Sequence, residues 1–311
     1  MKNIIPPIDK SILERELTED KFVRNTNFGA NKIYSITSQD SPNIMKEIGR
    51  LREYTFREAG GGTGKEVDID HFDDMPEPYR QLLVWDPDHH EILGGYRYII
   101  CSDLSDDFDY SNLATSKLFH FSEKFKKSYL PNMIELGRSF VQPQFQSTKS
   151  RKMLFALDNL WDGLGALVVD NPSVKYFFGK VTMYTHFNQR ARDYIIYFLE
   201  KYFGDQENLV YPKNPLKINL SEEELEALFC GNNYDENYRI LSQSTRSLGE
   251  NIPPLINSYM NLSPTMKMFG TANNPNFGNV EETGIMITIR DLYKTKVDRH
   301  VGSYRKEKNL V

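Results

Sequence analysis

Residues 134–143, which read IELGRSFVQP, place opposite charges inside a stretch that otherwise has the composition of a buried strand. Glu135 and Arg138 lie three residues apart, although a strand inside a sheet normally alternates or runs apolar. Gly137 lies between them, and glycine inside a strand often marks a bulge, which would bring residues three apart to one face. A charged pair on a kinked strand suits an active site. The alternative is a structural ion pair, which stabilises a protein poorly once desolvation is counted.

The bulk properties exclude several classes of protein. The 311 residues, 39% hydrophobic, suffice for a large core in one domain or two small ones. With 38 basic and 43 acidic side chains the formal charge is −5, so no overall attraction to nucleic acid is expected. Cys101 and Cys230 are too few and too distant for a disulfide scaffold or a four-ligand zinc site, and no histidine pattern suggests a metal. We expect a reducing compartment and no metal.

Neither a signal peptide nor a stretch of about 20 apolar residues is evident. We therefore expect a cytoplasmic protein, with any membrane contact peripheral and at the inner face. Basic residues do gather near the C-terminus: Arg290, Lys294, Lys296, Arg299, Arg305, Lys306 and Lys308. Each basic residue near an anionic lipid surface contributes about 1 kcal/mol, so this tail is a candidate for contact with an anionic membrane. A solvated, frayed tail is the alternative.

Periodicity and turn signals predict alternating strands and helices. Helices are expected at 8–20, from Ser41-Pro42 to about 59, at 115–125, 151–169 and 188–203, and opening at Ser221 and Pro253. Strands are expected at 31–36, 81–85, 92–101, 134–141, 175–183, 266–270 and 284–290. Antiparallel strands followed by a strand–helix–strand crossover predict an α/β fold with a mixed sheet.

More charged and aromatic residues precede the Glu135 strand in a spaced order. Arg52 and Phe56 lie one turn apart on a predicted helix and share a face. Asp70 and Asp73 follow in DIDHFD, and Arg97 lies in the predicted strand GGYRYI. Each has an ordinary alternative, a surface charge for Arg52 and Asp73 and an outward-facing strand position for Arg97.

In this order, R-x-x-x-F, D-x-x-D, a Gly-Gly-x-Arg strand and E-x-G-R-S-x-V-x-P resemble acyl-carrier-protein-dependent acyltransferases of the GNAT (acyl-CoA N-acyltransferase) superfamily. Two branches share the order: acyl-homoserine-lactone autoinducer synthases, and hemolysin-like N-acyltransferases that begin ornithine-lipid and glycine-lipid synthesis. Stretches 47–73, 135–146 and 252–279 are more similar to the second branch. The resemblance covers roughly residues 30 to 290.

The resemblance implies one GNAT-like domain over residues 1–311, with an N-terminal extension at about 1–30 and the basic tail at about 290–311. It also implies a mixed, mostly antiparallel sheet with a central splay, flanked by helices. The pantetheine arm of the acyl donor would enter that splay and pair with exposed backbone like an added strand.

The resemblance further implies acyl carrier protein as partner and acyl donor, with no tightly bound cofactor. The usual GNAT phosphate loop, Q/R-x-x-G-x-G/A, would fall at residues 146–151, where both glycines are missing. Without them the backbone cannot approach a pyrophosphate closely, which argues against coenzyme A. Lys149, Arg151 and Lys152 are expected to hold the single phosphate of the carrier's 4′-phosphopantetheine arm and to meet its acidic surface. A basic helix end that faces solvent is the alternative.

Site residues follow from the same resemblance. The expected catalytic set is Glu135, Arg138, Arg97, Asp73 and Asp70. The expected substrate-binding set is Arg52, Phe56, Phe140, Val141, Lys149, Arg151 and Lys152. Glu135 would act as base, and the N–H group of Phe140 or Val141 would stabilise the oxyanion. Either Arg138 or Arg97 would bind the acceptor carboxylate, unless Arg97 organises the two aspartates.

We expect N-acylation of a small amino acid, glycine favoured and ornithine open, with a 3-hydroxyacyl group as the first step of amine-lipid synthesis. One alternative is an autoinducer synthase that uses S-adenosylmethionine; those enzymes usually carry a tryptophan where this chain has Gly60-Gly61-Gly62. Another is a non-catalytic GNAT-like protein that binds lipid or a partner. Residues 60–65 do not form a P-loop, because a helix precedes them and Glu66 replaces Ser/Thr. We expect a mobile loop over the acceptor site there.

Overall fold

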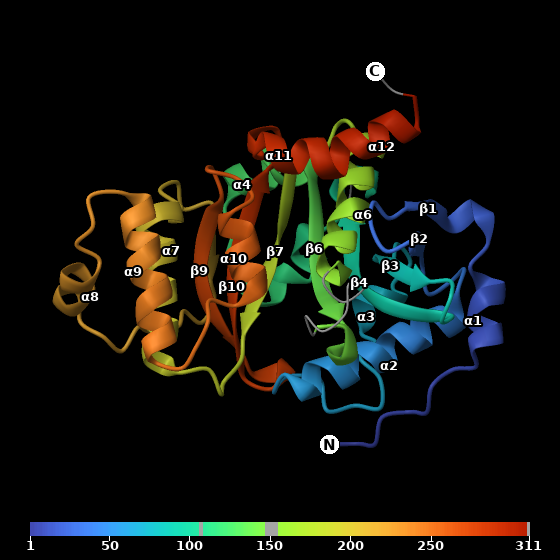
Figure 1. Cartoon of the computed structure of the whole chain (residues 1–311), viewed down its shortest axis with the longest axis horizontal. Coiled ribbons are helices and arrows are strands. Elements are labelled where there is room, and N and C mark those ends of the chain that lie inside the picture. Colours follow the sequence, from blue (N-terminus) through green and yellow to red (C-terminus); the bar gives the residue numbers. More distant parts are fainter. Residues whose placement is uncertain (106–107, 147–154, 310–311) are drawn as a thin grey trace. The chain divides into compact units, whose positions relative to one another are not determined.

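The structure, a computed structural model, describes residues 1–105, 108–146 and 155–309 (Figure 1). The chain forms two compact units, each built from segments that are far apart in the sequence. Unit 1 comprises Met1–Phe108, Asn132–Lys175 and Leu292–Val311, and unit 2 comprises Asp109–Pro131 and Tyr176–Asp291. The expectation of a single domain over the whole chain stays a prediction.

Unit 1 contains five antiparallel strands in the order β1-β2-β3-β4-β6. Their bounds are β1 Phe22–Asn25, β2 Lys32–Ile36, β3 Arg80–Asp86, β4 Glu91–Ile100 and β6 Met133–Val141. Its helices include α1 Lys10–Glu16, α2 Pro42–Glu58, α3 His71–Asp74, α6 Ala156–Asp170, α11 Lys294–Lys296 and α12 Gly302–Glu307.

Helices α2 and α6 cover opposite faces of the unit 1 sheet. Neighbouring residues of a strand point to opposite faces. Gln81 of β3 hydrogen-bonds to Arg52 of α2, whereas the next residue, Leu82, packs against Gly163 of α6 so closely that a Cβ at that position would overlap it. Arg97 of β4 pairs with Gln81, so its side chain lies on the α2 face.

Unit 2 contains the antiparallel strands β7-β10-β9 and the two-stranded ribbon β5-β8. The strands are β5 Phe119–Phe121, β7 Tyr176–Met183, β8 Val210–Pro212, β9 Lys267–Asn274 and β10 Val280–Thr288. The helices include α4 Glu123–Ser128, α7 Gln189–Phe203, α8 Glu222–Leu228, α9 Tyr234–Ser247 and α10 Pro254–Met260. Its core is aromatic: the ring of Phe178 lies 5.2 Å from Phe125 and 5.9 Å from Phe269.

Most predicted elements are confirmed. The helix predicted at 115–125 is wrong: the segment forms a 3₁₀ turn, the short strand β5 and the start of α4, because Ser122 caps a new helix through Phe125 N–H. The capping box at Ser221 is confirmed at the start of α8. Sequence periodicity missed α9 and the edge strand β1.

The C-terminal tail is folded through Asn309, the last residue described, so a frayed tail is the wrong alternative. The ring Nδ1 of His300 hydrogen-bonds to Asp162 Oδ1 of α6 at 2.7 Å, and Tyr304 donates to Asp170 at 3.0 Å. Burial, and then the charge of Asp170, raise the pKa of Tyr304. The tail thus packs on α6 with a buried face, and its basic side chains are exposed except for the half-buried Lys296. Among the helices of the described residues, none combines the length and apolar character that a membrane crossing needs.

Candidate active site

Strand β6 carries a bulge, as the sequence predicts. Arg97 of β4 pairs with Gly137 and Gly95 pairs with Phe140, so that two residues of β6 lie opposite a single residue of β4. The φ angle of Arg138 is +49°, in the left-handed region that residues other than glycine rarely occupy. Strained backbone of this kind is concentrated at functional sites. The bulge is confirmed, with the strained residue at Arg138, one position after the glycine that suggested it.

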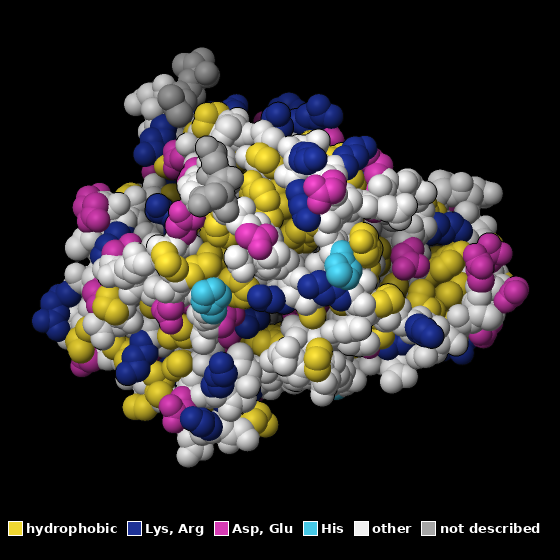
Figure 2. Space-filling model, turned by 180° about the vertical axis from the view of Figure 1, so that it is seen from behind, with side chains coloured by type: hydrophobic (Ala, Val, Ile, Leu, Met, Phe, Trp, Pro, Cys, Tyr) yellow, Lys and Arg dark blue, Asp and Glu magenta, His cyan; other side chains and the backbone are white. Residues whose placement is uncertain are grey.

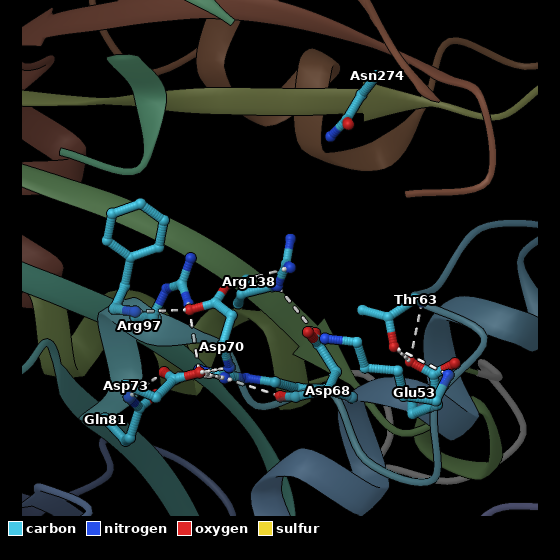
Figure 3. A network of polar contacts seen from close by, with 12 residues as sticks. Glu53, Thr63, Asp68, Asp70, Asp73, Gln81, Arg97, Arg138 and Asn274 are labelled. Carbon is cyan, nitrogen blue, oxygen red and sulfur yellow. Dashed lines mark hydrogen bonds and ion pairs between the residues drawn. The ribbon is translucent and has the colours of Figure 1, made fainter. Parts of the chain in front are cut away.

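The bulge brings the side chain of Arg138 to the face of the sheet that carries Arg97 (Figure 3). Arg138 Nε lies 2.8 Å from Asp68 Oδ2, and its Nη2 lies 3.5 Å from Asp70 Oδ2. Arg97 Nη1 lies 2.6 Å from Asp70 Oδ1 and 3.3 Å from Asp73 Oδ2. Asp70 therefore bridges the two guanidinium groups.

A capping box fixes the two carboxylates of the D-x-x-D motif at the start of α3. The side chain of Asp70 accepts a hydrogen bond from the N–H of Phe72 at 3.0 Å. In return the Asp73 carboxylate accepts one from the N–H of Asp70 at 3.1 Å. The spacing of three residues is the spacing that this reciprocal cap requires. The short turn thus presents both carboxylates to Arg97.

The arginines keep Asp70 ionised. Burial opposes the charge of Asp70, but the charge and hydrogen bond of Arg97, and then the charge of Arg138, outweigh burial and lower the pKa of Asp70 to about 2. Burial likewise lowers the pKa of Arg97, but the charges of Asp73 and Asp70 outweigh it and raise that pKa. These groups remain charged at neutral pH.

Arg52 is fully buried and contacts these residues from α2. Its Nη1 lies 3.3 Å from Asp73 Oδ1, and its Nη2 donates a hydrogen bond to Gln81 Oε1. Gln81 in turn donates to Asp73 at 3.0 Å. Burial lowers the pKa of Arg52, although Asp73 and Asp68 oppose that change. Arg52 therefore supports the carboxylates from the α2 side, and its contact with a substrate stays a prediction.

Asp68 completes the cluster and was missed in the sequence. It is fully buried, and burial raises its pKa although Arg138 and Arg52 act in the opposite direction. Asp68 and Asp70 are separated by one residue in the segment VDID, and both carboxylates lie beside the Arg138 guanidinium. The spacing of these two aspartates was the sequence signal that could have identified Asp68 as part of the site. The cluster of Arg52, Arg97 and Arg138 with Asp68, Asp70 and Asp73 is balanced in charge and is buried except at Arg138 and Asp70.

Glu135 is linked to this cluster through Tyr79, which sequence reasoning also missed. Glu135 is 1% exposed, and the hydroxyl of Tyr79 donates a hydrogen bond to Glu135 Oε2. The guanidinium carbon of Arg97 lies 5.2 Å from the centre of the Tyr79 ring. Cys101 lies nearby, and burial, followed by the charge of Glu135, raises the pKa of its thiol. The thiol therefore stays protonated, which argues against a nucleophilic role.

The remaining predicted residues fall in three places. Phe56 and Phe140 are buried in the core of unit 1, at 6% and 4% exposed. Gln142 N–H donates to Leu93 O at 3.0 Å, so in the alternating antiparallel pattern the N–H of Phe140 points toward β4 and that of Val141 points away from it. Lys149, Arg151 and Lys152 lie outside the described residues.

The glycine-rich segment 60–64 is held by Glu53, a fully buried residue of α2. Its carboxylate accepts hydrogen bonds from Thr63 N–H at 3.0 Å, Thr63 Oγ1 at 2.7 Å and Gly64 N–H at 2.7 Å. Burial opposes ionisation, but the hydrogen bonds from Thr63, Arg57 and Gly64 together outweigh burial and lower the pKa of Glu53. These bonds tie the segment to α2 in this structure, whereas the sequence predicts a mobile loop. Because its amides already surround a carboxylate, the segment is not a phosphate cradle.

Comparison with known proteins identifies the family of this chain. Residues 51–156 match the acetyltransferase (GNAT) domain family. A protein of Phocaeicola vulgatus named glycine N(alpha)-acyltransferase is 56% identical over 309 residues, which are 99% of this chain and 95% of that protein. One of the same name from Bacteroides thetaiotaomicron is 56% identical over 306 residues, 98% of this chain and 91% of that protein.

Among solved structures, FeeM, an N-acyl amino acid synthase from uncultured soil microbes, aligns with 84% of this chain and 91% of its own. The identity is 8% and the TM-score 0.42, which is too low to add to the argument.

The α/β fold with its mostly antiparallel sheet, together with the matched domain, defines a GNAT-type acyltransferase. At 56% identity over nearly the full length of both relatives, the chain belongs to the glycine N(alpha)-acyltransferase family. It is therefore an enzyme of the acyltransferase class, and the alternative of a non-catalytic scaffold is not supported.

Proposed function

We propose that this enzyme transfers a 3-hydroxyfatty acyl group from the thioester of acyl carrier protein to the α-amino group of glycine, the first step of amine-lipid synthesis. The observation that carries the proposal is the charge-balanced cluster beside the bulge, with Glu135 joined to it through Tyr79. Buried ion pairs stabilise a fold poorly, so a cluster of this size favours a functional reason. The names of the two curated relatives support glycine as the acceptor.

The proposed reaction is direct attack of the amine on the thioester carbonyl. The α-ammonium group must first lose a proton, which Glu135 takes directly or through a water molecule. The amine nitrogen then forms a bond to the carbonyl carbon, the C–S bond breaks, and the second amine proton leaves as the amide forms. The departing sulfur takes up a proton and leaves as a thiol, so no covalent enzyme intermediate is needed.

The tetrahedral intermediate needs a donor for its oxyanion. The N–H of Val141 points away from β4, whereas that of Phe140 lies in the ladder with β4. We therefore narrow the two candidates to Val141, whose fixed backbone dipole could meet the developing charge without reorganisation.

The acceptor carboxylate is assigned to Arg138 rather than Arg97. The Arg97 side chain is 4% exposed and is paired with Asp70 and Asp73. The Arg138 side chain is 15% exposed and lies at the edge of the cluster beside Asp70, which is 26% exposed. A guanidinium fork at such an edge matches the two oxygens of a carboxylate. Arg97 then organises the aspartates.

Replacing Arg138 by lysine tests this assignment. Lysine keeps a positive charge for Asp68 but loses the fork, so we expect KM for glycine to rise roughly tenfold while KM for the acyl donor stays unchanged. The matched control is Arg192→Lys in unit 2, a buried arginine that lies 2.6 Å from Asp193 and 2.7 Å from Glu281. An unchanged KM for glycine in the Arg138 variant would transfer the role to another residue.

The donor is proposed from the sequence of residues 146–151, where the glycines of the pyrophosphate loop are missing and basic residues stand instead. A single phosphate on a carrier protein needs fewer backbone contacts than a pyrophosphate does. Lys149, Arg151 and Lys152 are the proposed contacts for that phosphate and for the acidic carrier.

The experiment is a product assay with the purified chain. Glycine, ornithine or S-adenosylmethionine is supplied with 3-hydroxyacyl carrier protein or the corresponding acyl-CoA, and products are identified by mass spectrometry. We expect N-acylglycine from the carrier-bound donor. N-acylornithine alone would reassign the acceptor, and an adenosyl product would support the autoinducer alternative. Preference for acyl-CoA would overturn the donor assignment.

We also propose peripheral contact between the basic tail and anionic lipid. The side chain of Lys294 is 85% exposed and that of Arg299 is 40% exposed, while the buried face of the tail packs on α6. Figure 2 shows Lys and Arg side chains along the upper edge of the molecule, where Figure 1 places α11 and α12. Flotation with vesicles of anionic or neutral lipid would test this contact, and equal binding to both would contradict it.

A further inference from the structure

The side chain of Tyr79 connects Glu135 to the arginine cluster. Tyr79 immediately precedes β3, is 1% exposed, and is anchored by its backbone N–H, which donates to Phe72 O at 2.9 Å. Its ring packs edge-on against Phe72, with the ring centres 5.6 Å apart, and its face carries the Arg97 guanidinium. These contacts leave the ring little freedom, so its hydroxyl is held at Glu135 Oε2.

We infer that Tyr79 is a positioning residue for the catalytic base, an inference that rests on the proposed role of Glu135. A carboxylate that is 1% exposed has lost most of its hydration, so its hydrogen bonds to protein groups decide how it is held. A hydroxyl donor at Oε2 stabilises the ionised form and fixes the plane of the carboxyl group. It therefore also fixes the orientation of the other oxygen, Oε1.

The charged and titratable groups around Glu135 are consistent with this role. Arg97 lies over the ring of Tyr79, Cys101 follows the end of β4 and interacts with Glu135, and Arg138 follows Glu135 on β6. The positive charge of Arg97 on the ring makes the phenol a stronger hydrogen-bond donor. Arg97 also holds Asp70, beside the proposed acceptor site. Through Tyr79, the acceptor side of the cluster is thus connected to the base.

The test is Tyr79→Phe, which keeps the ring and removes the hydroxyl. We expect kcat to fall by a factor of roughly 10 to 100, the effect of losing a hydrogen bond to a charged group. The phenol donor stabilises the charged form of the carboxylate, so without it the acidic limb of the kcat–pH profile should move to higher pH. KM for glycine should stay unchanged.

The matched control is Tyr98→Phe. Tyr98 is also buried, its hydroxyl lies 2.7 Å from Ser35 Oγ, and it follows Arg97 on β4, so it faces the other side of the sheet. Its variant loses one buried phenol hydrogen bond away from Glu135, and we expect no movement of the acidic limb.

If Tyr79→Phe does not fold, 3-fluorotyrosine at position 79 keeps the packing and supplies a stronger donor, which should move the limb to lower pH. An unmoved limb in the folded variant would reduce Tyr79 to a structural role and overturn the inference. Glu135→Gln tests the proposed base separately from the inference about Tyr79. If that variant stays active, Glu135 is not the base. If it is inactive while neither Tyr79 substitution moves the limb, only the inference about Tyr79 fails.

Discussion

Replacing Glu135 by glutamine is expected to lower turnover by a factor on the order of 10² to 10⁴, the range that a general base contributes. Glutamine has nearly the same shape and can still accept the hydrogen bond of Tyr79, but it cannot take up a proton from the amine. The loss should appear in kcat with saturating glycine and acyl donor. KM for glycine should change little, because Arg138 is the proposed carboxylate contact.

The control for this variant is Glu47→Gln on α2. Glu47 is also buried, but its carboxylate pairs with Arg50 at 2.6 Å and accepts a hydrogen bond from the N–H of Ile8 at 3.1 Å, and neither partner belongs to β6. Both variants should unfold near the temperature of the parent chain. Turnover close to normal in a folded Glu135→Gln variant would remove this residue from the mechanism, and a smaller but equal loss in both variants would indicate a stability effect.

The sequence was informative about β6 because its signals were local. A glycine between two charges in an apolar run suggested a bulge, and the register break between Gly95 and Arg97 confirms it. The cause of the bulge differs from the one expected, however, because the unusual backbone conformation is not at the glycine. Gly137 has no left-handed φ, and a Cβ there would meet only Arg97 Nε, at 4.0 Å. The strain lies in Arg138, whose conformation depends on tertiary pairing with Asp68, which no local rule predicts.

Site residues could be predicted where their spacing in the sequence reflects local structure. They could not be predicted where their position depends on tertiary packing. The capping box explains why Asp70 and Asp73 lie three residues apart. Tyr79 carries no such signature, since a tyrosine before a strand is ordinary until the fold places its hydroxyl on Glu135. For Arg52 the sequence supplied half of the answer. Its spacing to Phe56 predicted that the two residues share a helix face, but it did not predict that Arg52 is fully buried against the carboxylates.

The sealed position of Arg52 leads to the largest expected effect on stability. Replacing Arg52 by methionine keeps the length of the side chain and removes its charge, which leaves Asp73 buried with Arg97 as its remaining cationic partner. Breaking a buried pair from one side costs about 3 to 5 kcal/mol of the free energy of unfolding. We expect a correspondingly lower midpoint of urea unfolding, with activity retained at temperatures where the variant is folded.

A double substitution tests whether Arg52 acts on stability, by neutralising Asp73, or on the reaction itself. If Arg52 acts mainly by neutralising Asp73, then adding Asp73→Asn should recover part of the stability lost in Arg52→Met, because the uncompensated carboxylate is gone. Lys294→Met is the surface control: Lys294 lies 2.6 Å from Asp298, but its side chain is 85% exposed, so water screens the pair and little change is expected. An Arg52→Met variant that is as stable as the parent but does not bind glycine would instead support a substrate-binding role for Arg52.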